Sequence, residues 1–475
     1  MIKKFINKLS VQQKATVIYM IASVFTQGVN FLTLPVYTRL LSTADMGVMT
    51  TFVSWYSILY AIGTLSLTSA SMSIAMMKYE NRRDQYQSVC LALSTVSAII
   101  FTVVYFAIKK IFNLEGLFST PIVLIISLLM VFQPALDSFY LRERYEYRYK
   151  SVLIVSVLTS ILSVILPIFL ICTLKRCSNG VDLAEARIVA QYGVMIFISF
   201  VIYLIIMKKG HCLYEREMVK FALRISIPLI VHTLAKNVLD TSARLMISKM
   251  CGNSEAGIFG TVYNISMIAL IVWNAINAAI VPYIFETLKV KKYEAVEQIV
   301  LKVLLLFSIV SVIITLVAPE ILSVMTTREY YSAVHMIPAI AAGIYFTAVY
   351  GVYGNMLLYA EKSMMVMIAT AITAVVNIGL NYILIIKFGY MAAAYATLIS
   401  FILLAILQGI MQIKAFKRVI VSTRKMLMIS GFTLIICLLC NIVYDYAVIR
   451  VGIVCILLLI IFISRNWWGS IFKNK

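Results

Sequence analysis

Apolar residues in this chain form runs of about twenty positions, and short polar segments separate the runs. A helix rises about 1.5 Å per residue, so such a run crosses the roughly 30 Å hydrocarbon core of a bilayer. Transmembrane β-strands would show alternating segments of about ten residues instead. The pattern predicts an all-α integral membrane protein with about 14 transmembrane helices. The predicted spans are residues 15–38, 47–77, 87–112, 119–141, 151–174, 186–207, 221–248, 256–286, 299–325, 333–359, 363–386, 389–413, 426–446 and 448–464.

The composition agrees with a membrane protein and excludes a soluble one. Of the 475 residues, 62% are hydrophobic and 13% are charged, and the mean hydropathy is +0.97. Soluble domains are about one quarter charged. This chain has too few polar residues to cover a surface in water.

Lysine and arginine concentrate in alternate connections between the runs. They cluster at both termini and in the segments 78–83, 142–150, 208–220, 289–292 and 414–425. Cytoplasmic loops carry such an excess of positive charge. We therefore expect both termini in the cytoplasm and an even number of spans.

The net charge of +21 does not indicate a nucleic-acid partner. The cations are scattered over many short loops, whereas nucleic-acid binding needs one basic stripe, so we expect membrane lipids as their partners. Cys437 and Cys440 form a C-x-x-C inside an apolar run with no second pair nearby. We interpret them as small apolar residues and expect neither a metal nor a cofactor.

An internal repeat is visible in two short polar turns. "LLSTADMG" at 40–47 aligns without a gap with "MCGNSEAG" at 250–257, an offset of 210 positions (250 minus 40). Six predicted spans separate the copies, so both have the same orientation, as in parallel-repeat transporters. We predict an N-terminal lobe at 1–207, a cytoplasmic linker at 208–220, a C-terminal lobe at 221–413 and two appended spans with a tail at 414–475.

The eight prolines all lie in or at the edges of predicted spans. A proline inside a helix removes a backbone hydrogen bond and bends the helix. Membrane helices tolerate the freed carbonyls where protein or a cavity satisfies them. Bends in both lobes favour a transporter over a duplication that serves packing alone, which is the alternative interpretation.

The seventh span carries the most informative polar residues. His232, Lys236, Asp240 and Arg244 are spaced four apart, which places them on one face of one helix. Each buried charge costs about 2.5–3.5 kcal/mol on insertion scales. One interpretation is a Lys–Asp–Arg ladder that holds the helix to its neighbours. The other is the lining of a water-filled cavity for an anion, which the unbalanced positive charge favours.

Other polar residues in the spans are candidates for the same cavity. The repeat offset places Asn30 opposite Asp240, so Asn30 is the strongest of them, and Asp240 is the candidate for ion coupling. Singly, such residues more often form helix–helix hydrogen bonds worth about 0.6 kcal/mol. The others are Gln27, Gln133, Asn264, Asn274, Asn277, Asn355, Asn377, Asn381 and Gln408.

Nothing in the sequence indicates an enzyme. The segments predicted outside the membrane are too short for a catalytic domain, and no G-x-x-x-x-G-K-[ST] phosphate loop occurs. The chain is therefore expected to be a transporter, driven by an ion gradient or by the gradient of its substrate.

Three segments resemble a known family. They are "LPVYTRLLSTADMG" at 34–47, "LLYAEKS" at 357–363 and "NIGLNYILIIKFGYMAAAYATLIS" at 377–400. They resemble the polysaccharide (O-antigen and capsule type) flippases of the multidrug/oligosaccharidyl-lipid/polysaccharide exporter superfamily. The family's G-A-A reads Met391-Ala392-Ala393-Ala394 here, a departure expected to affect packing and not the site.

The resemblance implies a V-shaped pair of six-helix lobes in the bacterial cytoplasmic (inner) membrane. It implies translocation of an undecaprenyl-diphosphate-linked oligosaccharide from the inner to the outer leaflet, by alternating access through a cationic cavity. The cavity cations map to Arg39, Lys236 and Arg244. Glycan polymerases and glycosyltransferases are the implied protein partners.

Four other functions are less favoured by the sequence. A lipid II flippase for peptidoglycan is expected to carry several arginines in its first lobe, where only Arg39 lies near a span. A multidrug exporter is expected to have cavity acids, and Asp240 stands almost alone. A membrane polymerase or glycosyltransferase needs a large outer loop. A non-transporting component of a glycan assembly complex is the remaining alternative.

Overall fold

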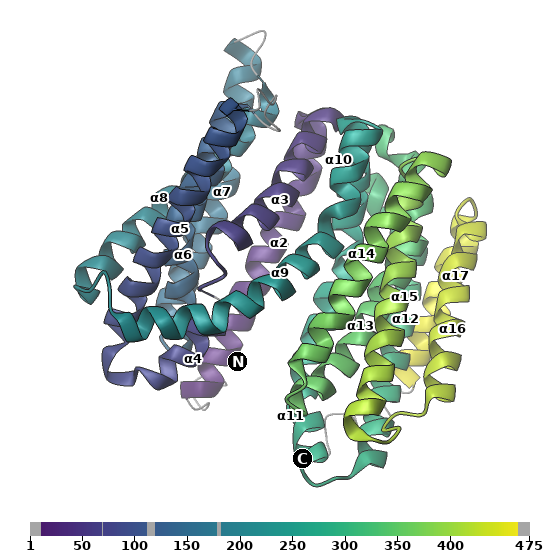
Figure 1. Cartoon of the computed structure of the whole chain (residues 1–475). Helices are drawn as coiled ribbons and strands as arrows, with labels where there is room; N and C mark the ends of the chain where they lie inside the picture. Colours follow the sequence, from purple (N-terminus) through teal and green to yellow (C-terminus); the bar gives the residue numbers. More distant parts are fainter. Residues whose placement is uncertain (1–10, 69, 112–118, 178–181, 464–475) are drawn as a thin grey trace. The chain divides into compact units, whose positions relative to one another are not determined.

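The computed structural model describes residues 11–68, 70–111, 119–177 and 182–463, which form helices joined by short turns (Figure 1). No β-strand occurs within these ranges. The chain divides into two compact units: Met1–Leu41 with Phe52–Leu234, here unit 1, and Ser42–Thr51 with Ala235–Lys475, here unit 2.

Unit 1 is a bundle of long helices. It contains α2 (Val11–Leu40), most of α3 (Thr43–Gly63), α4 (Ala70–Lys78), a short 3-10 turn (Glu80–Arg82), α5 (Arg83–Ile111), α6 (Thr120–Tyr145), α7 (Tyr149–Cys177), α8 (Leu183–Gly210) and the first part of α9 (Arg216–Met250).

Unit 2 is a second bundle, and it includes the first residues of α3. Its other elements are the end of α9, α10 (Asn253–Ser266), α11 (Ile268–Lys289), α12 (Tyr293–Met325), η2 (Arg328–Met336), α13 (Ile337–Tyr359), α14 (Ser363–Phe388), α15 (Ala392–Phe416), α16 (Thr423–Leu439), η3 (Cys440–Val443) and α17 (Ala447–Ile463).

The helices match the predicted spans. Within the described residues, 12 helical segments are long and apolar enough to cross a membrane. The 30-residue α2 and the shorter apolar α17 occupy the first and the last predicted spans. The prediction of an all-α membrane protein with about 14 spans is confirmed.

The prolines are used in two different ways. Six lie inside helices, where the missing N–H leaves a carbonyl without its helical partner. Pro121 and Pro338 occupy the first turns of α6 and α13. The expectation that all eight bend a helix is therefore wrong for these two, because an N–H in the first turn has no helical partner to lose.

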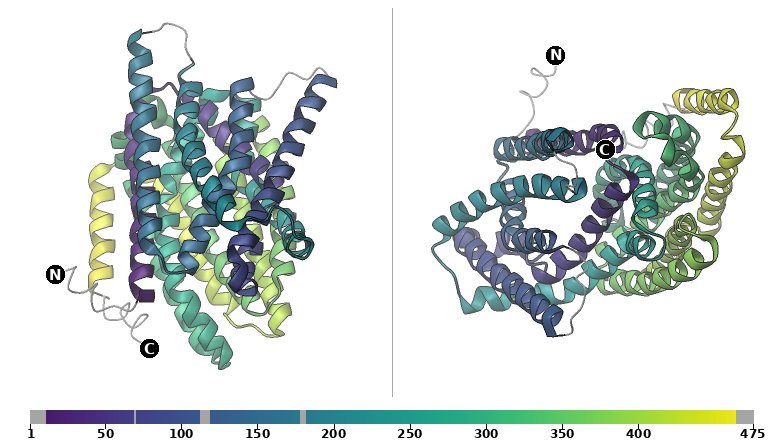
Figure 2. Two further views of the ribbon diagram at one scale, coloured as in Figure 1. Left: turned by 90° about the vertical axis from the view of Figure 1, so that its left-hand side faces the viewer. Right: turned by 90° about the horizontal axis from the view of Figure 1, so that it is seen from above.

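α13 lies at the centre of unit 2 and packs against α12, α14, α15 and α16 (Figure 2). Glycines take part in its contact with α15, since Gly343 of α13 faces Leu398 and Phe401, and Gly409 of α15 faces Tyr353. Small residues allow the helix backbones to approach closely, which supplies packing in a membrane that offers no hydrophobic driving force between helices.

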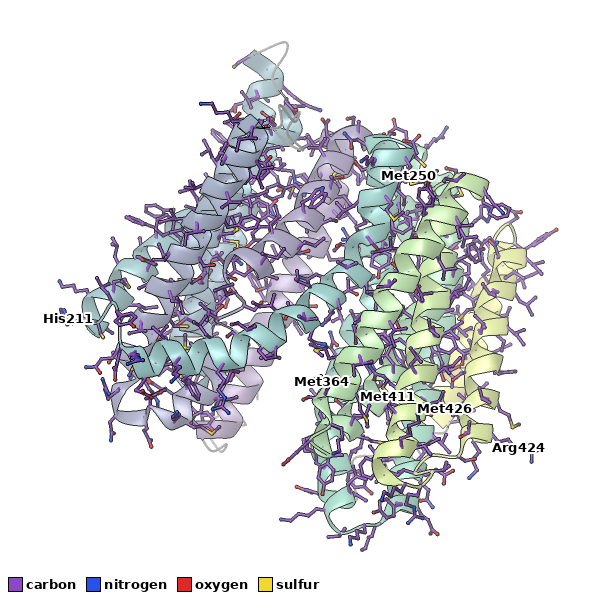
Figure 3. The ribbon with its side chains drawn as sticks, viewed as in Figure 1. His211, Met250, Met364, Met411, Arg424 and Met426 are labelled. Atoms are coloured by element: carbon purple, nitrogen blue, oxygen red, sulfur yellow. The ribbon has the colours of Figure 1, made fainter. Side chains whose placement is uncertain are left out.

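The connection between α8 and α9 packs against α5 and the 3-10 turn before it, within unit 1. Arg82 pairs with Glu215 at 2.5 Å, and the Ser88 hydroxyl donates to the Cys212 carbonyl at 2.7 Å. The predicted linker at 208–220 ends in the start of α9, where Met218 is buried and Lys220 is exposed. Figure 3 labels His211 in this connection. The linker and lobe boundaries inferred from the sequence stay predictions.

Candidate functional site

The charged face of α9 presents its side chains without forming ion pairs. Lys236 and Asp240 are exposed and Arg244 is half-buried. Among the described residues, no nitrogen of Lys236 or Arg244 lies within 4.0 Å of a carboxylate oxygen. The Lys–Asp–Arg ladder considered from the sequence is therefore not formed, and this face of unit 2 keeps a net positive charge.

Arg244 is held by aromatic and amide groups instead of a carboxylate. Its guanidinium carbon lies 4.8 Å from the centre of the Tyr263 ring, and Nη2 donates to Asn264 Oδ1 at 3.4 Å. Its Nε is buried without a hydrogen-bond partner. Arg244 thus keeps donor capacity for an anion.

A buried amide network fixes α9 in unit 2. Asn377 of α14 accepts a hydrogen bond from Ser242 of α9 at 2.7 Å and donates to Ser400 of α15 at 2.9 Å. Asn381 donates to the same Asn377 oxygen at 2.9 Å. Asn377 and Asn381 are fully buried. The network joins α9, α14 and α15 at Ser242, which lies two residues from both Asp240 and Arg244. It therefore fixes the rotation of α9 and the side on which Asp240 and Arg244 lie.

The two copies of the repeated turn lie against each other in unit 2. A Cβ on Gly47 of α3 would lie 1.7 Å from the Asn253 carbonyl oxygen, and one on Gly257 of α10 would lie 2.0 Å from the Thr43 oxygen. The pair Gly47–Asn253 and the pair Gly257–Thr43 are related by the offset of 210 positions. The contact between α3 and α10 therefore has a local two-fold symmetry. The hydroxyls of Thr43 and Ser254 lie 2.7 Å apart across it.

The other predicted site residues belong to unit 1. Arg39 and Asn30 are exposed on α2, and Arg39 Nη1 donates to the Pro35 carbonyl at 2.8 Å. His232 is half-buried on the part of α9 that precedes Ala235. Within unit 2, the structure brings Lys236, Asp240 and Arg244 together. The membership of Arg39, Asn30 and His232 in the same site stays a prediction.

Several of the other polar residues form helix–helix contacts, as expected of single amides. Asn355 donates to Asn277 at 2.9 Å, and Gln133 accepts from the Tyr56 hydroxyl. Gln408 is buried beside Gly354. Asn264 and Asn274 are exposed.

Two charged residues of unit 1 were missed by the sequence analysis. Asp137 lies in α6 and accepts a hydrogen bond from Tyr60. Arg187 is buried in α8, and its guanidinium carbon lies 3.6 Å from the centre of the Tyr37 ring. Both fall inside predicted spans, so an inventory of charges within the apolar runs would have found them. Asp240 is accordingly not alone as an acid within the spans.

Comparison with known families identifies the chain. The model of the family "Polysaccharide biosynthesis protein" matches residues 13–288, more than half of the sequence. The chain belongs to this family. The model of the family "MatE" also matches, at residues 228–383. No curated protein matches the chain.

Solved structures share the fold of this polysaccharide biosynthesis protein. The lipid II flippase MurJ, in an inward closed conformation, superposes with a TM-score of 0.67 at 14% identity and covers 95% of this chain and 99% of its own. An inward-facing multidrug resistance MATE transporter of the MOP superfamily gives 0.61 at 17%, covering 85% and 99%. A MOP transporter from Pyrococcus furiosus, described as having a binding pocket of reversed polarity, gives 0.52 at 17%, covering 86% and 97%. The chain is therefore a multi-pass membrane protein of the polysaccharide biosynthesis family, and it shares its fold with these transporters.

Proposed function

We propose that this protein moves an undecaprenyl-diphosphate-linked oligosaccharide repeat unit from the inner to the outer leaflet of the bacterial cytoplasmic membrane. The single observation that carries the proposal is the α9 face of unit 2. Lys236 and Arg244 flank Asp240 there without an ion pair, on a helix long and apolar enough to cross a membrane.

The chemistry of the proposed substrate matches this face. An isolated anion costs tens of kcal/mol in hydrocarbon by continuum estimates, so a diphosphate needs cationic partners to cross. An arginine guanidinium and a lysine ammonium are the side chains that bind phosphate oxygens. Under this proposal, Lys236 and Arg244 bind the diphosphate, Asn264 contacts sugar hydroxyls, and the prenyl tail stays in the bilayer.

The cycle proposed for this transport is alternating access of the two lobes, with Arg39, Asn30 and His232 of unit 1 taking part. Asp240 is proposed to release the cations when the substrate leaves, by competing with the phosphates for them. O-antigen or capsule repeat units are the substrates that the family resemblance favours. Polymerases and glycosyltransferases of the same glycan are the proposed protein partners.

Lipid II transport is a second candidate, and a specific observation favours it. The first lobe was expected to lack the intramembrane arginines of such a transporter, yet Arg187 is buried in unit 1. Lipid II is also a polyprenyl-diphosphate sugar, so the same cationic face would serve. Restored growth of a strain depleted of its lipid II flippase would favour this candidate, and restored surface glycan alone would favour the first.

The test is the double variant Lys236→Ala, Arg244→Ala in a strain whose surface glycan depends on this protein. We expect surface glycan to fall at least tenfold while lipid-linked precursor accumulates in the inner leaflet, because the diphosphate loses both cations. Lys249→Ala on the last turn of the same helix is the matched control and should leave export unchanged. Normal export by the double variant, at normal protein level, would contradict the proposal.

A further inference from the structure

A cavity of unit 1 lies among α5, α6 and α8, at the ends of these helices that are predicted to be cytoplasmic (Figure 1). Its volume is about 80 Å³, several times the roughly 10–15 Å³ that one water molecule needs. Each of the three helices contributes one face to the lining. The lining residues are Asp84, Gln87, Phe139, Arg142, Glu143, Arg148, Ile202, Ile205, Ile206 and Lys209.

The lining of this cavity changes from charged to apolar along the helices. All of its charged residues lie just beyond the ends of the predicted spans, whereas Phe139 and the three isoleucines lie inside them. Ile205 is exposed, so the apolar part of the lining reaches the outer surface of the bundle. A phospholipid has the same order of groups, a charged headgroup followed by apolar chains. Basic pockets of this kind between transmembrane helices bind lipid headgroups.

Two cations of the cavity keep hydrogen-bond donors for a ligand. Arg142 donates through Nη1 to Asp84 at 2.5 Å and to Gln87 at 2.7 Å, and through Nε to Glu146 at 2.9 Å. Its Nη2 makes no hydrogen bond among the described residues. Lys209 is exposed in the last turn of α8 and has no carboxylate partner in the described part of the chain. Arginine and lysine are the side chains that bind phosphate oxygens.

Two carboxylates complete the charged part of the lining. Asp84 is 44% exposed, and only its Oδ1 accepts a hydrogen bond from the residues that the structure describes. Glu143 is buried, and its Oε1 lies 3.5 Å from Arg148. The lining therefore holds three cations and two carboxylates. A headgroup with negative charge alone would be repelled by Asp84, whereas one with a phosphate and an ammonium finds a partner for each.

We propose that this cavity binds the headgroup of a zwitterionic phospholipid of the phosphoethanolamine type. Arg142 and Lys209 donate to the phosphate, the ammonium donates to Asp84, and the first groups of the acyl chains contact Phe139 and Ile205. The bound phospholipid stays in its leaflet and holds α5, α6 and α8 together. The proposal does not depend on which lipid the protein transports.

The test measures the melting temperature of the purified full-length protein in detergent micelles with a rising mole fraction of dioleoylphosphatidylethanolamine. Two lipids with the same chains are compared: dioleoylphosphatidylglycerol has no ammonium, and the nitrogen of dioleoylphosphatidylcholine has no N–H to donate. A ligand of the folded state stabilises it, so we expect a rise of at least about 3 °C with the phosphatidylethanolamine. The other two lipids should give at most about a third of that rise, because each lacks one of the contacts.

Variants of the cavity separate this site from general effects of lipid. Lys209→Ala should at least halve the rise and leave the melting temperature without lipid unchanged, because Lys209 is exposed and forms no ion pair among the described residues. Lys208→Ala, at the preceding exposed position of α8, is the matched control and should keep the full rise. Asp84→Asn should remove the preference for phosphatidylethanolamine over phosphatidylcholine.

Three results would overturn the proposal. They are equal stabilisation of the wild type by the three lipids, a larger rise with phosphatidylglycerol, and a Lys209→Ala protein that responds like the Lys208→Ala protein. Free phosphoethanolamine at the same concentration should have little effect, since it has no chains to contact Phe139 and Ile205. An equal rise with it would assign the cavity to a soluble ligand and contradict the lipid site. If Asp84→Asn does not fold, the comparison of Lys209→Ala with Lys208→Ala decides.

Discussion

Charged residues in this protein fall into two groups that differ in how they are neutralised. Arg142 and Arg450 have carboxylate partners, and the Arg450–Glu320 pair at 2.8 Å docks α17 on α12. Lys236 and Arg244 have none within the described residues. Pairing relieves most of the cost of a charge in a membrane, so the unpaired residues are the ones for which a ligand is the physical explanation.

The amide network at Asn377 should be worth about 2 kcal/mol. Asn377→Ala removes two hydrogen bonds that link α14 to α9 and α15 and a third within α14, and side-chain hydrogen bonds in membrane helices average roughly 0.6 kcal/mol each. The measurement is the free energy of unfolding in detergent micelles, compared with wild type. Asn30→Ala on the exposed face of α2 is the control and should have little effect. Equal stability of the two variants would show that the network does not hold α9.

The sequence predicted which charged residues share a face of α9, but it did not predict which residues of other helices contact the charged side chains. Lys236, Asp240 and Arg244 share a helix, so their spacing alone places them on one face. The partner of Arg244 is Tyr263, and the partner of Asp137 is Tyr60. These contacts join different helices, and a single sequence carries no signal for which helices meet.

At the scale of elements, the crossing of α3 and α10 gives the repeated glycines their role. Gly47 and Gly257 have no Cβ, and each faces a carbonyl oxygen of the other helix at a distance that no side chain allows. The repeat was visible in the sequence as a similar order of residues. That its two copies contact each other depends on the tertiary fold, which the alignment of the turns does not contain.

Gly47→Ala should force the two helices apart. The added Cβ would lie 1.7 Å from the Asn253 oxygen, which belongs to the backbone and cannot turn away. Overpacking of this kind costs about 1–3 kcal/mol, and we expect Gly257→Ala to cost a similar amount because of the local symmetry. The readout is the melting temperature and the rate of glycan export.

Gly28→Ala is the matched control for these variants. Gly28 lies in α2 with no atom within 4 Å of an added Cβ, and alanine is the better helix former, so stability should be equal or slightly higher. If Gly47→Ala behaved like Gly28→Ala, the α3–α10 contact would not be as close as described.

At the scale of the whole molecule, the hydrophobic pattern was sufficient for the number and order of spans. Runs of apolar residues report directly on the membrane, because every backbone group in hydrocarbon must bond within its own helix. The pattern did not reveal the break at 64–68, because its three hydroxyl residues alternate with Leu65 and Leu67 and the apolar run continues on both sides. It also did not show that α9 is one 35-residue helix whose two parts belong to different units.

The orientation predicted from the positive charges can be measured with native cysteines. Cys177 is the last residue of α7, at the end predicted to be outside, and Cys212 lies in the connection predicted to be cytoplasmic. In variants that retain one cysteine, a membrane-impermeant maleimide added to spheroplasts should label Cys177 and spare Cys212. After permeabilisation, both should react.

Cys177 is a better reporter of the outer side than Cys251, because their thiols differ in reactivity. Burial, and secondarily the Glu255 carboxylate, raise the pKa of the Cys251 thiol between α9 and α10. Since the thiolate is the reactive form, Cys251 should react more slowly than the exposed Cys177 at pH 7 and gain rate as the pH rises. Labelling of Cys212 without permeabilisation, together with protection of Cys177, would reverse the orientation, and with it the direction in which the substrate is proposed to move.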